Sequence, residues 1–536
     1  MADLLLRAAT VVDGTGAPRR PADVLVRAGV IAEVGVPGTL GTAGRVLDAQ
    51  GLVLAPGFID MHAHSDLQRL LEPDQPSRVT QGVTCEVLGQ DGLSYAPVDD
   101  ATLPVLRGQL AGWNGDPPEL DWGWRTVGEY LDRLDGAGAV NACYLVPHGT
   151  LRAQVLGWQR RAPGAGELDA MRALLAQGLA EGAVGMSSGL SYTPGMYADT
   201  EELVALCTVV AAHGGYHSPH QRSYGAGALA GYAEMVEISR RSGCPLHLAH
   251  ATMNFDLNRG RAGELLALLD RAIADGCDLT LDSYPYLPGS TTLAALLPSW
   301  ATEGGPPATL RRLADPAARE RIRQALEESG SDGCHGVVTD WATVQISGVR
   351  EPALASLVGR TVAEVAAERA TSGTEVCFEL LLADRLGTTI LQHVGHEENV
   401  RAIMRHRAHT AGSDGLLVGA RPHPRGWGTF ARYLGHYVRE AGVLTLEQAV
   451  HRMTGRPARR LRLERRGTIR PGHHADLVLF DADTVRDEAT FEHPRRPAAG
   501  IAHVLVNGVA VLSEGRPTGA RPGRALRRTD QGTRAR

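Results

Sequence analysis

The spacing of apolar residues divides the chain into two strand-rich ends and a long middle. Short runs of leucine and β-branched residues alternate with glycine-containing turns over the first fifty residues, which is typical of short antiparallel strands. The same pattern returns at 475–485 and 500–515. Neither end alone has enough strands for a stable domain, so we expect the two ends to pair in space as a small β-sandwich.

The middle of the chain alternates strand-like runs with segments of helical period. Helical segments such as 167–182 and 262–276 separate several of these runs. Eight β-then-α units predict an α/β fold, a (β/α)8 barrel of the TIM type. The candidate strands lie at 57–64, 82–90, 141–149, 183–190, 214–221, 245–251, 278–286 and 408–415.

These patterns also set the predicted domain boundaries. The sandwich would take residues 1–55 and 456–515, and the barrel residues 56–455. An insertion at about 288–345 follows the seventh strand, on the catalytic face of such a barrel, and could form a lid. The last segment, 516–536, carries seven arginines among Pro, Gly and Thr, and we expect it to be a disordered basic tail.

Charge and composition narrow the class of protein. Charged residues make up 21% of the chain and the formal net charge is −6, so no strong field favours nucleic acid or an anionic membrane. No apolar run approaches the ~18 to 20 residues that cross a bilayer, and the N-terminus does not resemble a signal peptide. The seven cysteines are scattered without a CxxC pair. We therefore expect reduced thiols and a cytoplasmic protein.

The chain contains no lysine, because all 54 Lys+Arg residues are arginine. This composition excludes Schiff-base chemistry, a pyridoxal phosphate anchor, a P-loop lysine and a carboxylated lysine between two metal ions. Any ligand that bridges two metals must therefore be a residue of another type.

Histidines and one aspartate recur at the ends of the predicted strands. His62 and His64 stand two residues apart in a strand-like run, which would put both imidazoles on one face, with Cα atoms roughly 6.5 Å apart. Alone, this pair is equally consistent with two hydrogen-bonded histidines that line the barrel. His220, His250 and Asp414 fall at three further strand ends. Four histidines and an aspartate at one barrel mouth form a ligand set that zinc prefers.

Several long segments, in order along nearly the whole chain, resemble the N-acyl-D-amino-acid deacylases (D-aminoacylases) of the amidohydrolase superfamily. They include GFIDMHAHSD, GAVGMSSGLSYTPGMYADTEEL, DSYPYLPGSTTL, HPRGWGTFARYLGHYVRE and GTIRPGHHADLVLFD. The resemblance implies a distorted barrel, a β-sandwich from both chain ends and zinc-dependent hydrolysis of N-acyl groups.

The resemblance also assigns roles to residues of this chain. It implies metal ligands at His62, His64, His220 and His250, and a catalytic base at Asp414 that also lies at the metal. It further implies a substrate pocket lined by Tyr192, Tyr284, Ser290 and Arg425.

Two positions depart from the family pattern. Asp91, in LGQDGLS, stands where the family has a cysteine metal ligand, and a carboxylate can also bridge two metals. We expect Asp91 to be a ligand, whereas the alternative is a turn cap before glycine; Glu86 and Cys85 are weaker bridge candidates. Thr252 replaces a lysine that is common in the family, which removes one cation from the pocket.

Seven further histidines stay outside the predicted ligand set. His148 matches a family loop motif and would contact the metal ligands but not the metal. The others are assigned to structural, capping or pocket-rim positions. These are His213, His217, His393, His396, His473 and His474.

Three functional interpretations follow. The first is a hydrolase of linear N-acyl amides of D-amino acids or related compounds, with one or two Zn²⁺ or another divalent ion. The second keeps the metal site but acts on a cyclic amide, dipeptide or ureido substrate. The third is a barrel that has lost its activity and serves as a scaffold, which the complete His/Asp set disfavours. The sequence does not predict the acyl group, the stereochemistry or the oligomeric state.

Overall fold

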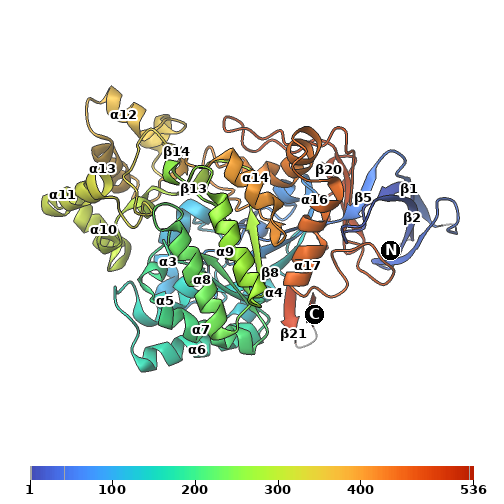
Figure 1. Ribbon diagram of the computed structural model, residues 1–536, viewed down its shortest axis with the longest axis horizontal. Helices are drawn as coiled ribbons and strands as arrows, with labels where there is room; N and C mark the ends of the chain where they lie inside the picture. Colours follow the sequence, from blue (N-terminus) through green and yellow to red (C-terminus); the bar gives the residue numbers. More distant parts are fainter. Residues whose placement is uncertain (1–2, 42, 530–531, 536) are drawn as a thin grey trace.

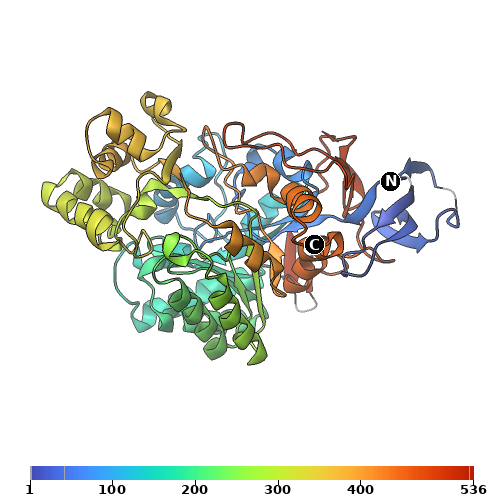
Figure 2. The same cartoon turned by 45° about the horizontal axis from the view of Figure 1, so that its top comes forward.

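The barrel lies between two smaller units in a computed structural model, which describes residues 3–41, 43–529 and 532–535. The sheet built from the chain ends lies at one end of the molecule, and helices α10 to α13 of the insertion lie at the other (Figures 1 and 2). Within these residues, no helix is long and apolar enough to cross a membrane.

Eight parallel strands form the barrel in chain order, as the alternating pattern predicted. Most are buried along their whole length, because helices cover the outside of a parallel sheet. The first and last strands meet through the Met61 N–H donating to the Ala411 carbonyl at 3.2 Å and the Asp414 N–H donating to the His62 carbonyl at 2.8 Å. The strands are β6 (Phe58–Asp60), β7 (Val83–Leu88), β8 (Asn141–Pro147), β9 (Gly185–Gly189), β10 (Tyr216–His220), β11 (Leu246–Leu248), β12 (Leu279–Ser283) and β16 (His409–Ala411).

Amphipathic helices follow these strands and pack on the barrel. N-terminal capping residues mark where these helices begin. The Asp199 carboxylate accepts a hydrogen bond from the Glu202 N–H at 2.9 Å, and Thr126 with Glu129 forms a capping box. The helices around the barrel include α3 (Thr102–Asn114), α4 (Val127–Leu134), α5 (His148–Leu156), α6 (Ala165–Ala180), α7 (Thr200–Ala212), α8 (Ala228–Ser242), α9 (Ala262–Ala274), α14 (Glu397–Arg405), α15 (Arg425–Arg432), α16 (Leu446–Met453) and α17 (Gly455–Arg460).

The two ends of the chain form one nine-stranded sheet, as expected from their strand patterns. The junction is the antiparallel pair of β5 and β17, in which Val53 lies opposite Phe480. The sheet contains β1 (Leu4–Val11), β2 (Arg20–Arg27), β3 (Val30–Gly35), β4 (Arg45–Asp48), β5 (Val53–Pro56), β17 (Leu477–Phe480), β18 (Ile501–Val506), β19 (Val509–Ser513) and β20 (Arg516–Pro517).

The insertion is longer than the predicted 288–345. Its three-stranded sheet pairs Ser290 with Leu391 and Ile346 with Ile390, so it continues to Gln392. Helices beyond residue 345 belong to it because their apolar residues share its core, for example Val365 and Phe378. Its elements are β13 (Gly289–Thr292), α10 (Gly305–Ala314), α11 (Pro316–Gln324), β14 (Val344–Gly348), α12 (Val362–Glu368), α13 (Gly373–Ala383) and β15 (Thr389–Gln392).

The structure also differs from the predicted disordered tail in the residues it describes. Strands β21 (Leu526–Thr529) and β22 (Gly532–Ala535) pair as a hairpin. Leu526 is fully buried with apolar residues of the barrel strands, such as Ile59 of β6 and Leu145 of β8. The Arg527 guanidinium donates to Asp132 at 2.6 Å. The buried Leu526 side chain and the contact of Arg527 with Asp132 therefore order a segment whose composition alone indicates disorder.

Candidate metal centre and active site

Six side chains predicted as metal ligands converge at the carboxyl ends of the barrel strands. His62 and His64 follow β6, Asp91 follows β7, His220 ends β10, His250 follows β11 and Asp414 follows β16. None of the six is more than 7% exposed. Because parallel strands end at one mouth of a barrel, residues from distant parts of the sequence meet there.

The six residues form two groups with potential metal-ligand atoms within 4.8 Å of one another. One consists of His62, His64, Asp91 and Asp414, and the other of Asp91, His220 and His250.

The distances within both groups suit cation binding. His64 Nε2 lies 3.2 Å from Asp414 Oδ1 and 3.5 Å from Asp91 Oδ2. His250 Nε2 lies 3.4 Å from Asp91 Oδ1 and 3.0 Å from His220 Nδ1. Imidazole and carboxylate donors in this number fit one or two divalent ions of the zinc type.

Asp91 is the residue that the two groups share. Its Oδ1 is buried without a hydrogen-bond partner, so this atom does not cap the turn in which Asp91 lies. Asp91 also has a φ of +53°, and His250 and Asp414 have φ values of +29° and +49°. Such left-handed backbone is unfavourable for these residues and is kept where the surrounding structure holds functional groups in place.

The electrostatics of the cluster favour positive charge. Burial lowers the pKa of His64, but the Asp414 and Asp91 carboxylates outweigh it and raise the pKa to about 10. Burial likewise opposes protonation of His250, whose pKa Asp91 and Asp414 raise to about 9. Burial favours protonation of Asp91, yet the surrounding histidines hold its pKa well below the usual value. A bound cation would satisfy these carboxylates.

Two buried residues outside the predicted set contact the candidate ligands. Asp282, at the end of β12, accepts a hydrogen bond from the His250 N–H at 2.9 Å, and its other oxygen lies 3.0 Å from His247 Nε2 and 3.8 Å from His62 Nδ1. Ser191 Oγ lies 2.6 Å from His220 Nε2. Asp282 lies at the end of β12 and Ser191 lies two residues beyond β9, so the strand-end location could have revealed both from the sequence.

Arg425 lies against Asp414 at the edge of the cluster. Its Nη2 is 2.9 Å from Asp414 Oδ2, and its guanidinium carbon lies 4.4 Å from the centre of the Tyr284 ring. Arg425 is fully buried, and its Nε and Nη1 atoms have no hydrogen-bond partner. Burial is the largest influence on the pKa of Asp414 and favours protonation. The Arg425 guanidinium is the next largest, and it helps to hold the pKa of this carboxyl far below the usual value.

A small cavity of about 60 Å³ opens beside the cluster. Tyr192, Tyr284 and Ser290, which were predicted to contact substrate, line it together with Thr252. His335, from the insertion, also lines this cavity, and no sequence feature indicated that role. The insertion therefore covers part of the barrel mouth that holds the cluster, as we predicted for a lid.

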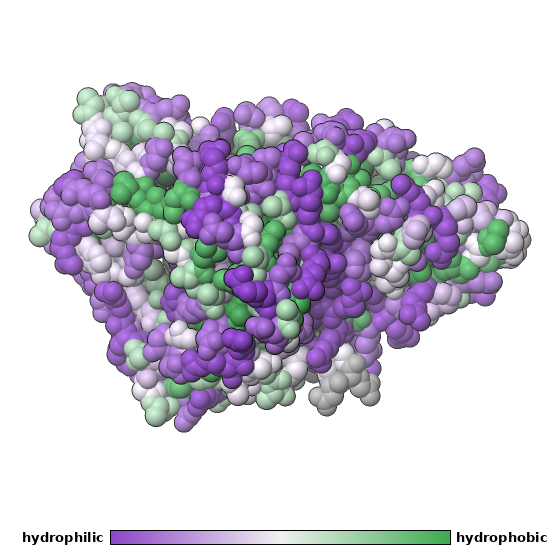
Figure 3. Space-filling model, viewed as in Figure 1, coloured by the Kyte–Doolittle hydropathy of each residue, from purple (hydrophilic) through white to green (hydrophobic). Residues whose placement is uncertain are grey.

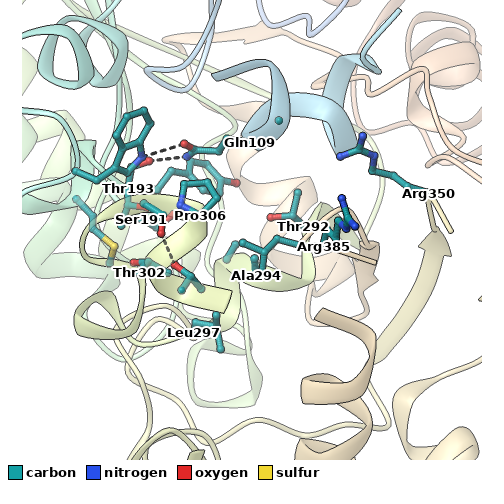
Figure 4. A pocket seen from close by; sticks show the side chains of 18 residues that line it. Gln109, Ser191, Thr193, Thr292, Ala294, Leu297, Thr302, Pro306, Arg350 and Arg385 are labelled. Carbon is teal, nitrogen blue, oxygen red and sulfur yellow. Dashed lines mark hydrogen bonds between the residues drawn. The ribbon is translucent and has the colours of Figure 1, made fainter. Parts of the chain in front are cut away.

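A larger chamber of about 260 Å³ shares Tyr192 with this cavity. Figure 4 shows Gln109, Ser191 and Thr193 on one side and Arg350 and Arg385 on the other. Its walls are largely apolar and come from both the barrel loops and the insertion. The apolar residues include Trp158, Met196, Ala294, Leu297 and Leu386.

The weaker bridge candidates lie outside both groups of ligands. Glu86 accepts hydrogen bonds from Ser65 Oγ at 2.5 Å and Arg78 Nε at 2.9 Å, so its carboxylate already has partners. Cys85 lies within β7 and is buried among apolar residues of the barrel strands, such as Ile59 and Cys143.

None of the histidines left out of the predicted set joins a ligand group among the described residues. His148 lies 2.8 Å from Glu202 Oε1, His217 lies 2.8 Å from Ser188 Oγ and His393 lies 3.0 Å from Gln345 Oε1. His213 lies 2.9 Å from a carbonyl of its own helix and His396 lies 3.0 Å from the Phe255 carbonyl. His473 lies 3.1 Å from Thr468 Oγ1, and His474 bridges to Val30 at the terminal sheet.

Comparison with known proteins places this site in a family. The amidohydrolase family matches residues 45–512. The chain is 38% identical over 528 residues to both a D-aminoacylase and an N-acyl-D-glutamate deacylase of Alcaligenes xylosoxydans xylosoxydans, which covers 98% of this chain and 98% and 96% of those relatives. The crystal structure of N-acyl-D-glutamate deacylase from Bordetella bronchiseptica matches 98% of this chain and 100% of its own, with a TM-score of 0.83 at 35% identity. The chain therefore belongs to the amidohydrolase family, together with the D-aminoacylases and N-acyl-D-amino-acid deacylases that it resembles.

Proposed function

We propose that the protein is a zinc-dependent hydrolase that cleaves the amide bond of N-acyl-D-amino acids. The observation that carries this proposal is that the two groups of candidate ligands share Asp91 and that one of them also contains Asp414. The relatives support the substrate class, because two of them are a D-aminoacylase and an N-acyl-D-glutamate deacylase. The related Bordetella enzyme was solved with zinc and a phosphonate that mimics the tetrahedral intermediate.

We assign the metal to His62, His64, Asp91, His220, His250 and Asp414. Asp91 would serve two ions if two are bound, since histidines of both pairs lie within 3.6 Å of its carboxylate. Its Oδ1 faces His62 and His250, and its Oδ2 faces His64 and His220. A divalent ion held by these residues would lower the pKa of a bound water to about 7 and would polarise the acyl carbonyl.

Asp414 is assigned the proton transfers. Its Oδ1 faces the histidines, while Oδ2 is held by Arg425. The carboxylate accepts a proton from the attacking water and then donates it to the departing amine nitrogen. Because Arg425 favours the charged form of Asp414, the group starts the reaction as a base.

Tyr192, Tyr284, Ser290 and Arg425 are assigned to the substrate. Arg425 is buried against Asp414, and its Nε and Nη1 atoms, which have no hydrogen-bond partner, are donors suited to a carboxylate. Ser290 offers a hydroxyl in the cavity that Asp414 also lines. Thr252 supplies no charge here, so Arg425 would be the main cation for the amino-acid carboxylate. We place the larger apolar substituent of the substrate in the chamber beside Tyr192.

A substrate panel tests the proposal. Zinc-loaded protein is assayed with N-acetyl-D- and N-acetyl-L-amino acids, dipeptides and hydantoins, and released amine is measured. We expect turnover of N-acetyl-D-amino acids with little turnover of the L-enantiomers. Preference for hydantoins or dipeptides would instead support a cyclic or peptide substrate, and would reject the proposed class.

A variant tests the role of Asp414. We expect Asp414→Asn to lower kcat by about 10²–10⁴-fold, because the amide cannot accept a proton from water, while bound metal and the unfolding temperature stay close to wild type. Activity within tenfold of wild type would assign the proton transfer to another group.

We further propose that the protein acts in the cytoplasm. All seven cysteines are free in the described structure and six of them are buried, which suits a reducing compartment. Fractionation of the source cells, followed by detection with an antibody, tests this location; recovery outside the cytoplasmic fraction would contradict it.

A further inference from the structure

A second polar cavity lies at the opposite end of the barrel from the metal cluster. It has a volume of about 380 Å³, and residues at the start of three barrel strands line it: Tyr216 of β10, Leu279 of β12 and Ala408 just before β16. The candidate ligands His220 and Asp414 lie at or beyond the far ends of β10 and β16. The cavity shares no lining residue with the cavity beside the metal cluster or with the chamber of Figure 4, so it is separate from both.

Five arginines and a single carboxylate line this cavity. The arginines are Arg407, Arg456, Arg459, Arg460 and Arg462, and the carboxylate belongs to Asp278. Asp278 Oδ1 pairs with Arg460 Nη2 at 2.7 Å, and Arg407 pairs with Asp270 at 3.0 Å.

Three of the five guanidinium groups have no carboxylate partner. Arg456, Arg459 and Arg462 form no ion pair in the part of the chain that the structure describes. Arg456 donates to the His409 carbonyl at 2.8 Å, and Arg459 Nη2 donates to His451 Nε2 at 3.1 Å. These contacts fix the guanidinium groups without neutralising them.

The local fold crowds these charges together. Arg456, Arg459 and Arg460 lie on the short helix α17 at spacings of three and four residues, which places them on one face. Burial, followed by repulsion from Arg452 and Arg459, lowers the pKa of Arg456 to about 10. Figure 3 shows hydrophilic residues covering the surface over α17 and beside β21.

We propose that this cavity binds a small multivalent oxyanion of the phosphate class, held by Arg456, Arg459 and Arg462. Guanidinium groups present paired N–H donors that match phosphate oxygens, and a concave site with uncompensated positive charge concentrates anions. The protein as a whole has a net charge of −6, which fits binding of a small anion in this cavity better than binding of an extended nucleic acid.

Titration calorimetry on the metal-loaded protein tests this proposal. Orthophosphate and ATP are titrated separately at constant ionic strength, with sodium chloride as the reference. We expect saturable binding of both, whereas tighter binding of ATP would identify the phosphoryl group of a nucleotide as the preferred source. Absence of binding by either anion above the chloride reference would overturn the proposal.

Variants locate the anion. Arg459→Gln/Arg462→Gln changes two exposed side chains, so the fold should persist, and we expect binding at least tenfold weaker than wild type. Arg456→Gln should weaken it as well. The matched control is Arg311→Gln/Arg470→Gln, which removes the same charge at two exposed arginines elsewhere and should bind as wild type.

One further variant separates this site from the metal centre, where phosphate could also bind. Asp91→Ala should keep the anion binding, because the cavity lies at the other end of the barrel. Binding that is lost in Asp91→Ala but retained in Arg459→Gln/Arg462→Gln would place the anion at the metal and refute the arginine site.

Discussion

At the scale of single residues, the site depends on a few carboxylates that are buried beside histidines. Such burial is unfavourable unless each charge is partnered. Asp91 has histidine nitrogens on both sides, and Asp414 has His64 on one oxygen and Arg425 on the other. The left-handed backbone at Asp91 and Asp414 shows that the fold holds these groups against a local conformational preference.

Substitution of Asp91 tests its place between the two ligand groups. We expect Asp91→Ala to lose most bound metal, because Asp414 would remain as the only anionic residue of the assigned ligand set and would offset little of the charge of divalent ions beside four neutral histidines. Asp91→Cys should retain a tight site, since a thiolate also carries negative charge. Atomic emission spectrometry after dialysis measures the metal content; full occupancy in Asp91→Ala would exclude Asp91 as a ligand.

Asp282 is expected to act through the ligands that it positions. Asp282→Asn keeps an oxygen for the His250 N–H but loses the charge that faces His247 and His62. We predict metal affinity about 10- to 100-fold weaker, as for other groups that orient metal-bound histidines. Competition with a chromogenic chelator measures this affinity. Asp275→Asn, at an exposed surface pair, is the control, and equal affinities in the two variants would exclude the role.

At the scale of elements, the barrel strands were predicted well and two other segments were not. Each strand contains its own apolar run and ends near a polar residue, so local pattern is enough to find it. The insertion was cut short at 345 because β15 is recognised only through its pairing with β13 and β14. The tail was predicted to be disordered because composition does not show that Leu526 meets the barrel strands.

Leu526 gives a test of the ordered tail. We expect Leu526→Ala to lower the free energy of unfolding by about 2–5 kcal/mol, as is usual for a fully buried leucine, and to lower Tm by several degrees. Arg521→Ala, at a partly exposed pair with Asp74, should change stability by less than about 0.5 kcal/mol. Thermal unfolding followed by circular dichroism compares them; equal Tm values would mean that the tail does not pack on the barrel in solution.

At the scale of the whole molecule, the terminal sheet and the barrel share one apolar interface. Val53, Val478 and Phe480 of the sheet pack with Phe58 and Val83 of the barrel. Gly82 lies in this interface: a Cβ added to it would come within 2.8 Å of Val478 and 2.9 Å of Phe58. The chain ends therefore stabilise the first two barrel strands, and with them the loops that carry His62 and Asp91.

Gly82→Ala tests this interface against a matched control. Gly82 and Gly51 have the same φ of +82°, but a Cβ at Gly51 would meet nothing within 4 Å. Both alanine variants carry the same backbone cost, so the difference isolates packing, and we expect Gly82→Ala to be less stable than Gly51→Ala by about 1–3 kcal/mol. Urea unfolding measures the difference; equal stabilities would show that the interface adapts without cost.

The sequence by itself determined the α/β barrel, the pairing of the two chain ends and the strand-end residues that meet at the candidate site. It could do so because apolar periodicity is a local property that identifies each strand. Parallel strands of a barrel then place all their carboxyl ends at one mouth. Tertiary structure alone decided that Asp91 faces both pairs of histidines, that Asp282 and Ser191 contact candidate ligands, and that His335 enters the site from the insertion. It also brought the arginines of α17 and Arg407 to one cavity. These contacts join residues far apart in the chain, and their geometry depends on packing that no local pattern records.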